Sequence, residues 1–230
     1  SVREAEEMIS ACKNAGVQLM VGHMVRLSHL VTRIKAIIHS GLIGEVSAVK
    51  TEFVYNAGIS QRSWVFDQKV AGGGPLFDIG VHCLDTMRFI LDDEVVSVKS
   101  HLEPPPTVSR TESTATVLLR FSRNALGTIY CSYVSPIRRS FIEVIGSEGV
   151  LSALNFTRSS ITIPLTIVRR SNSEDGVREI EEIAVPDLYV DEVNLFSQCI
   201  LDNSEPAIPG SAGLENQRVL DEALRQGIKH

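Results

Sequence analysis

From Val95 onward the chain is a series of short segments rich in β-branched and aromatic residues, each bounded by turn residues. Clusters of glycine, proline, asparagine and serine interrupt the pattern at regular intervals. The predicted strands are 95–102, 112–121, 126–134, 139–146, 149–155, 161–169 and 177–184. Short strands joined at this spacing favour an antiparallel sheet. Two helices, predicted at 188–202 and 213–226, close the chain.

The first residues follow a different pattern. Ser1 and Glu4 have the spacing of a helix capping box, apolar residues at helical spacing follow, and Gly16 provides a stop. Residues 17–21 form a short apolar run, which we interpret as a buried parallel strand. A helix, a glycine turn and a buried strand are typical of the closing unit of a doubly wound α/β sheet.

These patterns divide the chain into two unequal parts. Residues 1–24 are expected to be the last helix and strand of a truncated dinucleotide-binding (Rossmann) domain. Residues 25–230 are predicted to form one α+β domain for substrate binding and oligomerisation: an open, mostly antiparallel sheet with helices on one face. Its other elements are a helix at 28–40, a strand at 46–55 and a helix at 75–91. We expect the uncovered sheet face to form a homodimer or homotetramer.

Charge and cysteine spacing argue against several functional classes. With 28 acidic and 22 basic residues, the net charge is −6, so there is no basic field for nucleic acid. The four cysteines lie far apart, without zinc-ligand spacing, and are expected to be reduced, mostly buried thiols. No apolar run approaches the ~18 residues of a membrane span. We therefore expect a cytoplasmic protein with no metal and no nucleic-acid or membrane partner.

The predicted helix at 75–91 carries a candidate acid/base group. On a helical wheel, Asp78, His82 and Asp85 fall on one narrow polar stripe opposite the apolar face. An aspartate one turn before a histidine can accept the ring N–H and fix its tautomer, as a general acid/base requires. An ordinary solvated surface helix shows the same spacing, so the wheel leaves both interpretations open.

Three consecutive glycines, at 72–74, come directly before this helix. Glycine lets the backbone approach a ligand or another strand closely, and the helix N-terminus behind it has free N–H groups. The run lacks the Gly-Lys-Ser/Thr ending of a phosphate loop. We interpret it as a turn of close approach.

The segment 72–85, GGGPLFDIGVHCLD, resembles the signature of the Gfo/Idh/MocA oxidoreductases. Residues 4–22 resemble the end of that family's nucleotide-binding domain, and residues 26–46 its crossover into the second domain. The resemblance implies a second domain of the dihydrodipicolinate-reductase-like type. It also implies NAD- or NADP-dependent hydride transfer to or from a hydroxyl-bearing carbon of a sugar, cyclitol or related polyol.

The same resemblance implies roles for two residues. Asp78 and His82 match the family's catalytic aspartate and histidine, which act with a lysine from a Glu-Lys-Pro motif. His82 would take the hydroxyl proton and Asp78 would orient His82. The Gly-x-Gly-x-x-Gly loop and the Glu-Lys-Pro motif are absent from this sequence. We therefore expect the chain to be part of a longer enzyme and to be inactive alone.

Met24, Arg26, Trp64 and Arg138 are predicted to bind substrate. Met24 follows the predicted parallel strand, where the family approaches nicotinamide, so it is also the predicted cofactor contact. Trp64 can wall a sugar pocket or pack in the core. Arg138 can recognise a carboxylate or phosphate, or belong to a solvated turn. A non-catalytic binding or dimerisation module of the same fold is the alternative function.

Overall fold

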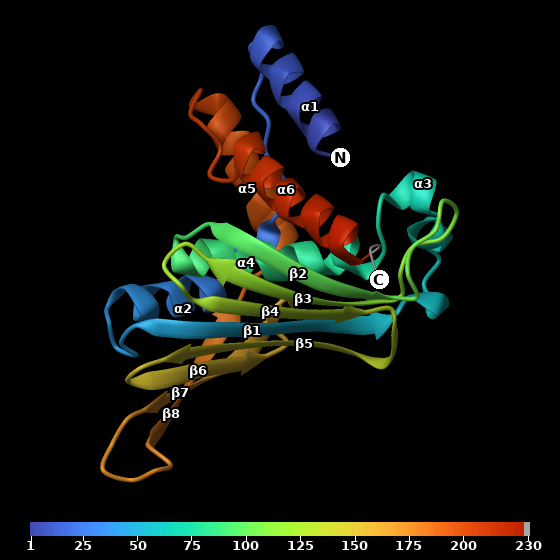
Figure 1. Ribbon diagram of the computed structural model, residues 1–230. Helices are drawn as coiled ribbons and strands as arrows, with labels where there is room; N and C mark the ends of the chain where they lie inside the picture. Colours follow the sequence, from blue (N-terminus) through green and yellow to red (C-terminus); the bar gives the residue numbers. More distant parts are fainter. Residues whose placement is uncertain (228–230) are drawn as a thin grey trace.

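An eight-stranded sheet organises the computed structural model, with the strand order β2-β3-β4-β1-β5-β6-β7-β8 (Figure 1). The strands are β1 (Val46–Asn56), β2 (Val95–Glu103), β3 (Thr114–Phe121), β4 (Leu126–Ser132), β5 (Val134–Gly146), β6 (Gly149–Leu154), β7 (Ile161–Arg169) and β8 (Val177–Val185). Only β1 and β4 pair in parallel; all other neighbours are antiparallel. The predicted α+β class and mostly antiparallel sheet are confirmed. The structure describes residues 1–227, so the last three residues of the predicted second domain lie outside it.

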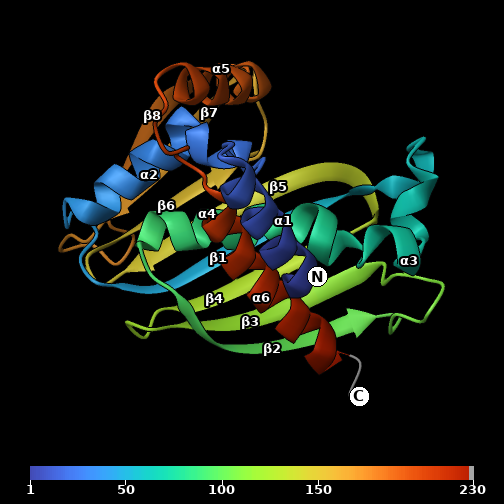
Figure 2. The same cartoon turned by 90° about the horizontal axis from the view of Figure 1, so that it is seen from above.

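The helices gather on one face of the sheet, as predicted (Figure 2). They are α1 (Val2–Ala15), α2 (His29–His39), α3 (Gln68–Ala71), α4 (Val81–Leu91), α5 (Leu188–Leu201) and α6 (Gly210–Gly227). Helix α4 buries Leu84, Met87 and Ile90 in the same core that holds Val117 and Ile129 of the sheet. Helix α6 packs against β2 and α1, and short helical turns at η1 (Met24–Leu27) and η4 (Leu76–Gly80) complete this layer.

The first helix forms as predicted, but the strand after it does not. Ser1 and Glu4 make the capping box, and Gly16 ends the helix in the left-handed conformation. Residues 17–21 pair only through an isolated bridge between Met20 and Pro209. A parallel strand needs a neighbour to accept its backbone hydrogen bonds, and none of the described strands lies beside this segment. The segment just before α6 is the only pairing partner of residues 17–21 in the described part of the chain, and it pairs at this one bridge.

Two further features concern the cysteines and the lengths of the helices. All four cysteines are free, and Cys83, Cys131 and Cys199 are buried, as predicted. No helix within residues 1–227 is both long enough and apolar enough to cross a membrane.

The glycine run makes its close approach to another backbone segment. A Cβ on Gly74 would lie 2.1 Å from the Glu112 carbonyl oxygen, a distance no real contact allows. The buried Glu112 carboxylate accepts hydrogen bonds from the N–H groups of Gly74, at 3.0 Å, and Leu76, at 3.2 Å. Burial raises the pKa of Glu112, and these backbone donors partly offset the rise. The turn therefore fixes where the following helix begins.

That helix differs from the prediction in its first turn. Residues 75–91 were expected to form one α-helix, but Leu76–Gly80 is a π-helical turn and the α-helix begins at Val81. A π turn contains more residues than an α turn, so it rotates the side chains before it relative to those after it. Asp78 lies in this turn, which changes its direction relative to His82 and Asp85.

We expect Gly74→Ala to lower the free energy of unfolding by roughly 2–4 kcal/mol, because the new methyl group must displace the Glu112 backbone. Gly22→Ala is the control, since its Cβ would meet only the two Glu192 carboxylate oxygens, at 3.6 and 3.8 Å, which is ordinary contact distance. Urea denaturation of both variants measures the difference. Equal midpoints for the two variants would show that the Gly74–Glu112 contact does not hold the turn.

Candidate functional site

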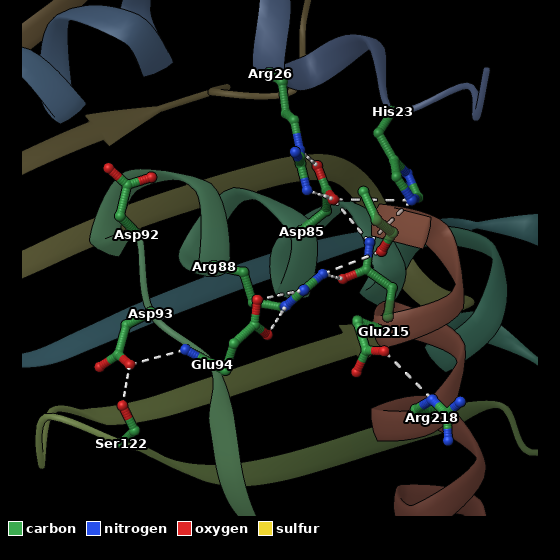
Figure 3. A network of polar contacts seen from close by, with 12 residues as sticks. His23, Arg26, Asp85, Arg88, Asp92, Asp93, Glu94, Ser122, Glu215 and Arg218 are labelled. Carbon is green, nitrogen blue, oxygen red and sulfur yellow. Dashed lines mark hydrogen bonds and ion pairs between the residues drawn. The ribbon is translucent and has the colours of Figure 1, made fainter. Parts of the chain in front are cut away.

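Asp85, at the centre of helix α4, lies in a buried polar network (Figure 3). It is 1% exposed, and its carboxylate accepts two hydrogen bonds from Arg26, through Nε and Nη2, both at 2.6 Å. Asn216 donates a third, at 2.7 Å. The prediction that Asp85 belongs to a polar stripe away from the core is therefore wrong, because η1 and α6 cover this part of the helix. An arginine fork and an amide replace the water that the carboxylate loses.

The surroundings of Asn216 fix its amide orientation. Its Oδ1 accepts a hydrogen bond from Arg88 Nη1 at 2.6 Å, and its Nδ2 lies 2.7 Å from Asp85 Oδ1 and 2.9 Å from His23 Nε2. Arginine only donates and a carboxylate only accepts, so Nδ2 must be the donor to both neighbours. His23 Nε2 is then an acceptor, and the ring carries its proton on Nδ1. Burial lowers the pKa of His23, which favours this neutral form.

Arg26 belongs to this network and is not among the residues that line the cavity at His82. Its guanidinium is bound to Asp85 on one edge and lies 5.5 Å from the centre of the Phe89 ring. Arg88 is held in a similar way, by Glu94 at 2.8 Å and by the Ala212 carbonyl at 3.1 Å. The role of Arg26 as a substrate contact stays a prediction.

A cavity of about 290 Å³ lies beside the network. It is lined by residues from η1, β1, the loop after β1, the helix formed by η4 and α4, the start of β5, the loop after β6, and α5. These residues are Met24, Val25, Phe53, Tyr55, Arg62, Asp78, Ile79, His82, Arg138, Thr157 and Tyr189. The structure thus brings together four of the predicted site residues, Met24, Asp78, His82 and Arg138. Trp64 is not among the lining residues; it is 47% exposed and stacks on Arg62 at 4.9 Å.

Asp78 is held by residues that the sequence pattern did not reveal. Its carboxylate accepts hydrogen bonds from Arg62 Nη2 at 2.6 Å, from Arg62 Nη1 at 3.3 Å and from the Tyr55 hydroxyl at 3.0 Å. Burial, reinforced by the Asp78 charge, raises the pKa of Tyr55 to about 12, so Tyr55 stays protonated as a donor. The expected hydrogen bond from the His82 ring to Asp78 does not form, because the π turn directs Asp78 toward β1 and the following loop.

His82 lines the cavity with its neutral form favoured. Its Nδ1 atom is buried and has no hydrogen-bond partner among the described residues. The ring meets His23 edge-on, with 6.3 Å between centroids. Burial first, and the neighbouring His23 second, lower the pKa of His82 to about 4, although Asp85 and Asp78 raise it in part. A neutral imidazole at pH 7 can accept a proton from a bound hydroxyl group.

These side chains include groups of the kind that proton transfer uses. Among the described residues, no group of three or more His, Cys, Asp or Glu side chains could hold a metal ion. The cavity combines a histidine whose neutral form is favoured, an aspartate held by two donors, and an apolar wall from Met24, Val25 and Ile79. This combination can bind a polyhydroxyl compound and remove a hydroxyl proton.

Comparison with known proteins shows which family the chain resembles. The sequence model of the GFO/IDH/MocA C-terminal domain matches residues 31–152. The chain is 28% identical to D-apiose dehydrogenase of Rhizobium rhizogenes, over 71% of the chain and 48% of that protein. It is 26% identical to D-xylose 1-dehydrogenase [NADP(+)] of Haloarcula marismortui, over 93% of the chain and 59% of that protein. The chain therefore spans about half to three-fifths of the length of these two relatives.

A solved structure shows the same fold. The aldose-aldose oxidoreductase from Caulobacter crescentus, complexed with glycerol, superposes with a TM-score of 0.85 at 24% sequence identity. The match covers 100% of this chain and 67% of that one.

We expect Asn216→Ala to lower the free energy of unfolding by roughly 2–4 kcal/mol, because it removes a partner from Asp85, Arg88 and His23 together. Glu215→Ala is the control, since this neighbour in α6 is exposed and forms only a surface ion pair with Arg218. Thermal and urea denaturation measure both. A loss for Asn216→Ala no greater than that of the control would contradict the role of the network.

Proposed function

Because the chain belongs to the Gfo/Idh/MocA family of oxidoreductases, we propose that it is the substrate-binding part of an NAD- or NADP-dependent dehydrogenase or reductase. The proposed substrate is a sugar, cyclitol or related polyol. One observation carries the proposal: His82, with its neutral form favoured, lines the same cavity as the ionisable Asp78 and its hydroxyl and guanidinium partners. That arrangement supplies a base and several directional contacts for hydroxyl groups.

In the oxidation direction, a substrate hydroxyl is placed at His82. Because Nδ1 is buried, Nε2 is the ring atom that can receive the hydroxyl proton as the carbonyl forms. Asp78 is fixed by Arg62 and Tyr55, so it can accept a hydrogen bond from a second hydroxyl and orient the substrate. In the reduction direction, the protonated His82 returns its proton to the new alkoxide.

A bound nicotinamide dinucleotide would supply the two-electron acceptor or donor for the hydride. The apolar wall of the cavity fits one face of a flat, weakly polar ring, and Met24 is the residue we propose for that contact. This is the only cofactor contact that we assign to residues of this chain.

Two broader assignments are also proposals. We place the boundary between the last helix and strand segment of a dinucleotide-binding domain and the substrate domain between residues 24 and 25. We propose a cytoplasmic location, which the free thiols support because reduced cysteines are usual in a reducing compartment.

We expect His82→Ala in the complete protein to lower kcat by roughly 10²–10⁴-fold through loss of the general base, with little change in cofactor affinity. His101→Ala is the control, because His101 is exposed on β2, away from the cavity. The assay is a panel of sugars and cyclitols with NAD and NADP, measured by absorbance of the reduced cofactor. Near-normal turnover of His82→Ala would refute the assigned role.

The same assay separates the two candidate functions. A non-catalytic binding or dimerisation module would bind polyols without oxidising any of them with either cofactor. Turnover that depends on His82 excludes that alternative.

We further propose that the uncovered sheet face joins two or more copies of the chain. Leu118 is 55% exposed, Leu126 56% and Tyr130 40%, and all three lie on this face of the paired strands β3 and β4. Apolar side chains gathered on one exposed face are typical of an interface.

Light scattering of the complete protein at micromolar concentration should therefore give the mass of a dimer or tetramer. Leu118→Arg should shift the mass toward the monomer, because it places a charge in the proposed interface. Leu42→Arg should not, since Leu42 is 40% exposed in the turn after α2, outside the sheet. A monomeric wild-type protein would contradict this proposal.

A further inference from the structure

The cavity holds one positive charge that the chain does not neutralise. Three of its lining residues, Arg62, Asp78 and Arg138, carry full charges at neutral pH. Arg62 and Asp78 neutralise each other through their paired hydrogen bonds. Arg138 forms no ion pair with any carboxylate of residues 1–227, and its guanidinium lies 5.5 Å from the centre of the Phe53 ring. The lining therefore has an excess of one positive charge.

The side chain of Arg138 is positioned toward the cavity by the alternation of strand β5. Its neighbour Arg139 points to the other sheet face, where it lies 3.3 Å from Glu52 and stacks on Phe141 at 5.9 Å. Arg138 instead stacks on Phe53, which is 6% exposed and lines the cavity itself. Stacking limits the motion of a guanidinium group but leaves its N–H edge free to donate. A planar pair of N–H donors matches the two oxygens of a carboxylate.

We propose that the substrate of this site is a sugar acid, a polyhydroxyl compound whose carboxylate binds Arg138 while a hydroxyl group lies at His82. The inference rests on the proposed function and narrows its substrate class. One unpaired arginine balances one negative charge, as a carboxylate requires. A phosphate group carries more charge and is usually held by several cations or by a helix N-terminus, and the cavity offers only one free cation among its described residues.

Paired substrates that differ only in the acid group test the proposal. In the complete protein with its cofactor, we expect kcat/KM to be at least about tenfold higher for a hexuronate or aldonate than for its neutral counterpart. The probes are D-galacturonate with D-galactose, D-glucuronate with D-glucose, and D-gluconate with D-glucitol. Arg138→Met should lower kcat/KM for the acid by roughly 10–100-fold, mainly through KM, and should lower kcat/KM for the neutral partner by a much smaller factor.

Two further variants separate geometry from charge. Arg138→Lys should restore part of the loss, because lysine keeps the charge but lacks the planar fork. Arg139→Met should leave kcat/KM unchanged for both the acid and the neutral substrate, because Arg139 lies on the opposite face of the sheet. The proposal would be overturned if Arg138→Met lowered kcat/KM equally for acid and neutral substrates. It would also be overturned if wild-type kcat/KM were the same for both. Neither result would contradict the proposed function.

If none of the probes is oxidised or reduced, isothermal titration calorimetry with the same probes still tests whether the cavity binds acids. Absence of turnover with both cofactors would count against the proposed function. Binding of D-galacturonate or another of the acids that is lost in Arg138→Met would still support an acid site. Absence of acid binding, or binding that Arg138→Met leaves unchanged, would overturn it.

Discussion

The structure depends first on the burial of one carboxylate. Asp85 is enclosed by η1, α4 and α6, and a buried carboxylate is stable only where donors replace its water. Arg26 and Asn216 are those donors, and each belongs to a different element. The network therefore joins three segments that lie far apart in the sequence. It also fixes the tautomer of His23, whose ring meets His82 at the edge of the cavity.

A second buried carboxylate, that of Glu112, fixes the N-terminal end of the helix formed by η4 and α4. Glu112 binds the backbone of the glycine turn, and the π turn that follows directs Asp78 toward Tyr55 and Arg62. The candidate proton acceptor and the candidate orienting group thus come from one helix but are positioned by separate contacts. The cavity forms where these two ends, strand β1 and the start of β5 meet.

Much of this fold could be predicted because it follows local rules. Alternating residues bounded by turn residues identified every strand of the sheet, and helical patterns located every helix except the four-residue α3. The prediction of a strand at residues 17–21 was wrong because a strand needs a neighbouring strand, which the local sequence pattern cannot reveal. The helical wheel failed at Asp78 and Asp85 because it assumes an unbroken α-helix and a solvated polar stripe. Tyr55 and Arg62 were not predicted as site residues, because they become hydrogen-bond donors to Asp78 only in the folded chain. The one available signal for Arg62 was its place in the polar loop before the glycine run.

The central claim is that the fold keeps His82 neutral beside a polar cavity, ready to accept a proton. NMR titration of the His82 Cε1–H resonance in the complete protein tests it most directly, with His82→Gln identifying the signal. We predict a pKa of about 4, well below the ordinary histidine value of 6.5. A pKa at or above 6.5 would mean that the ring is solvated or paired with a carboxylate, and would contradict the account.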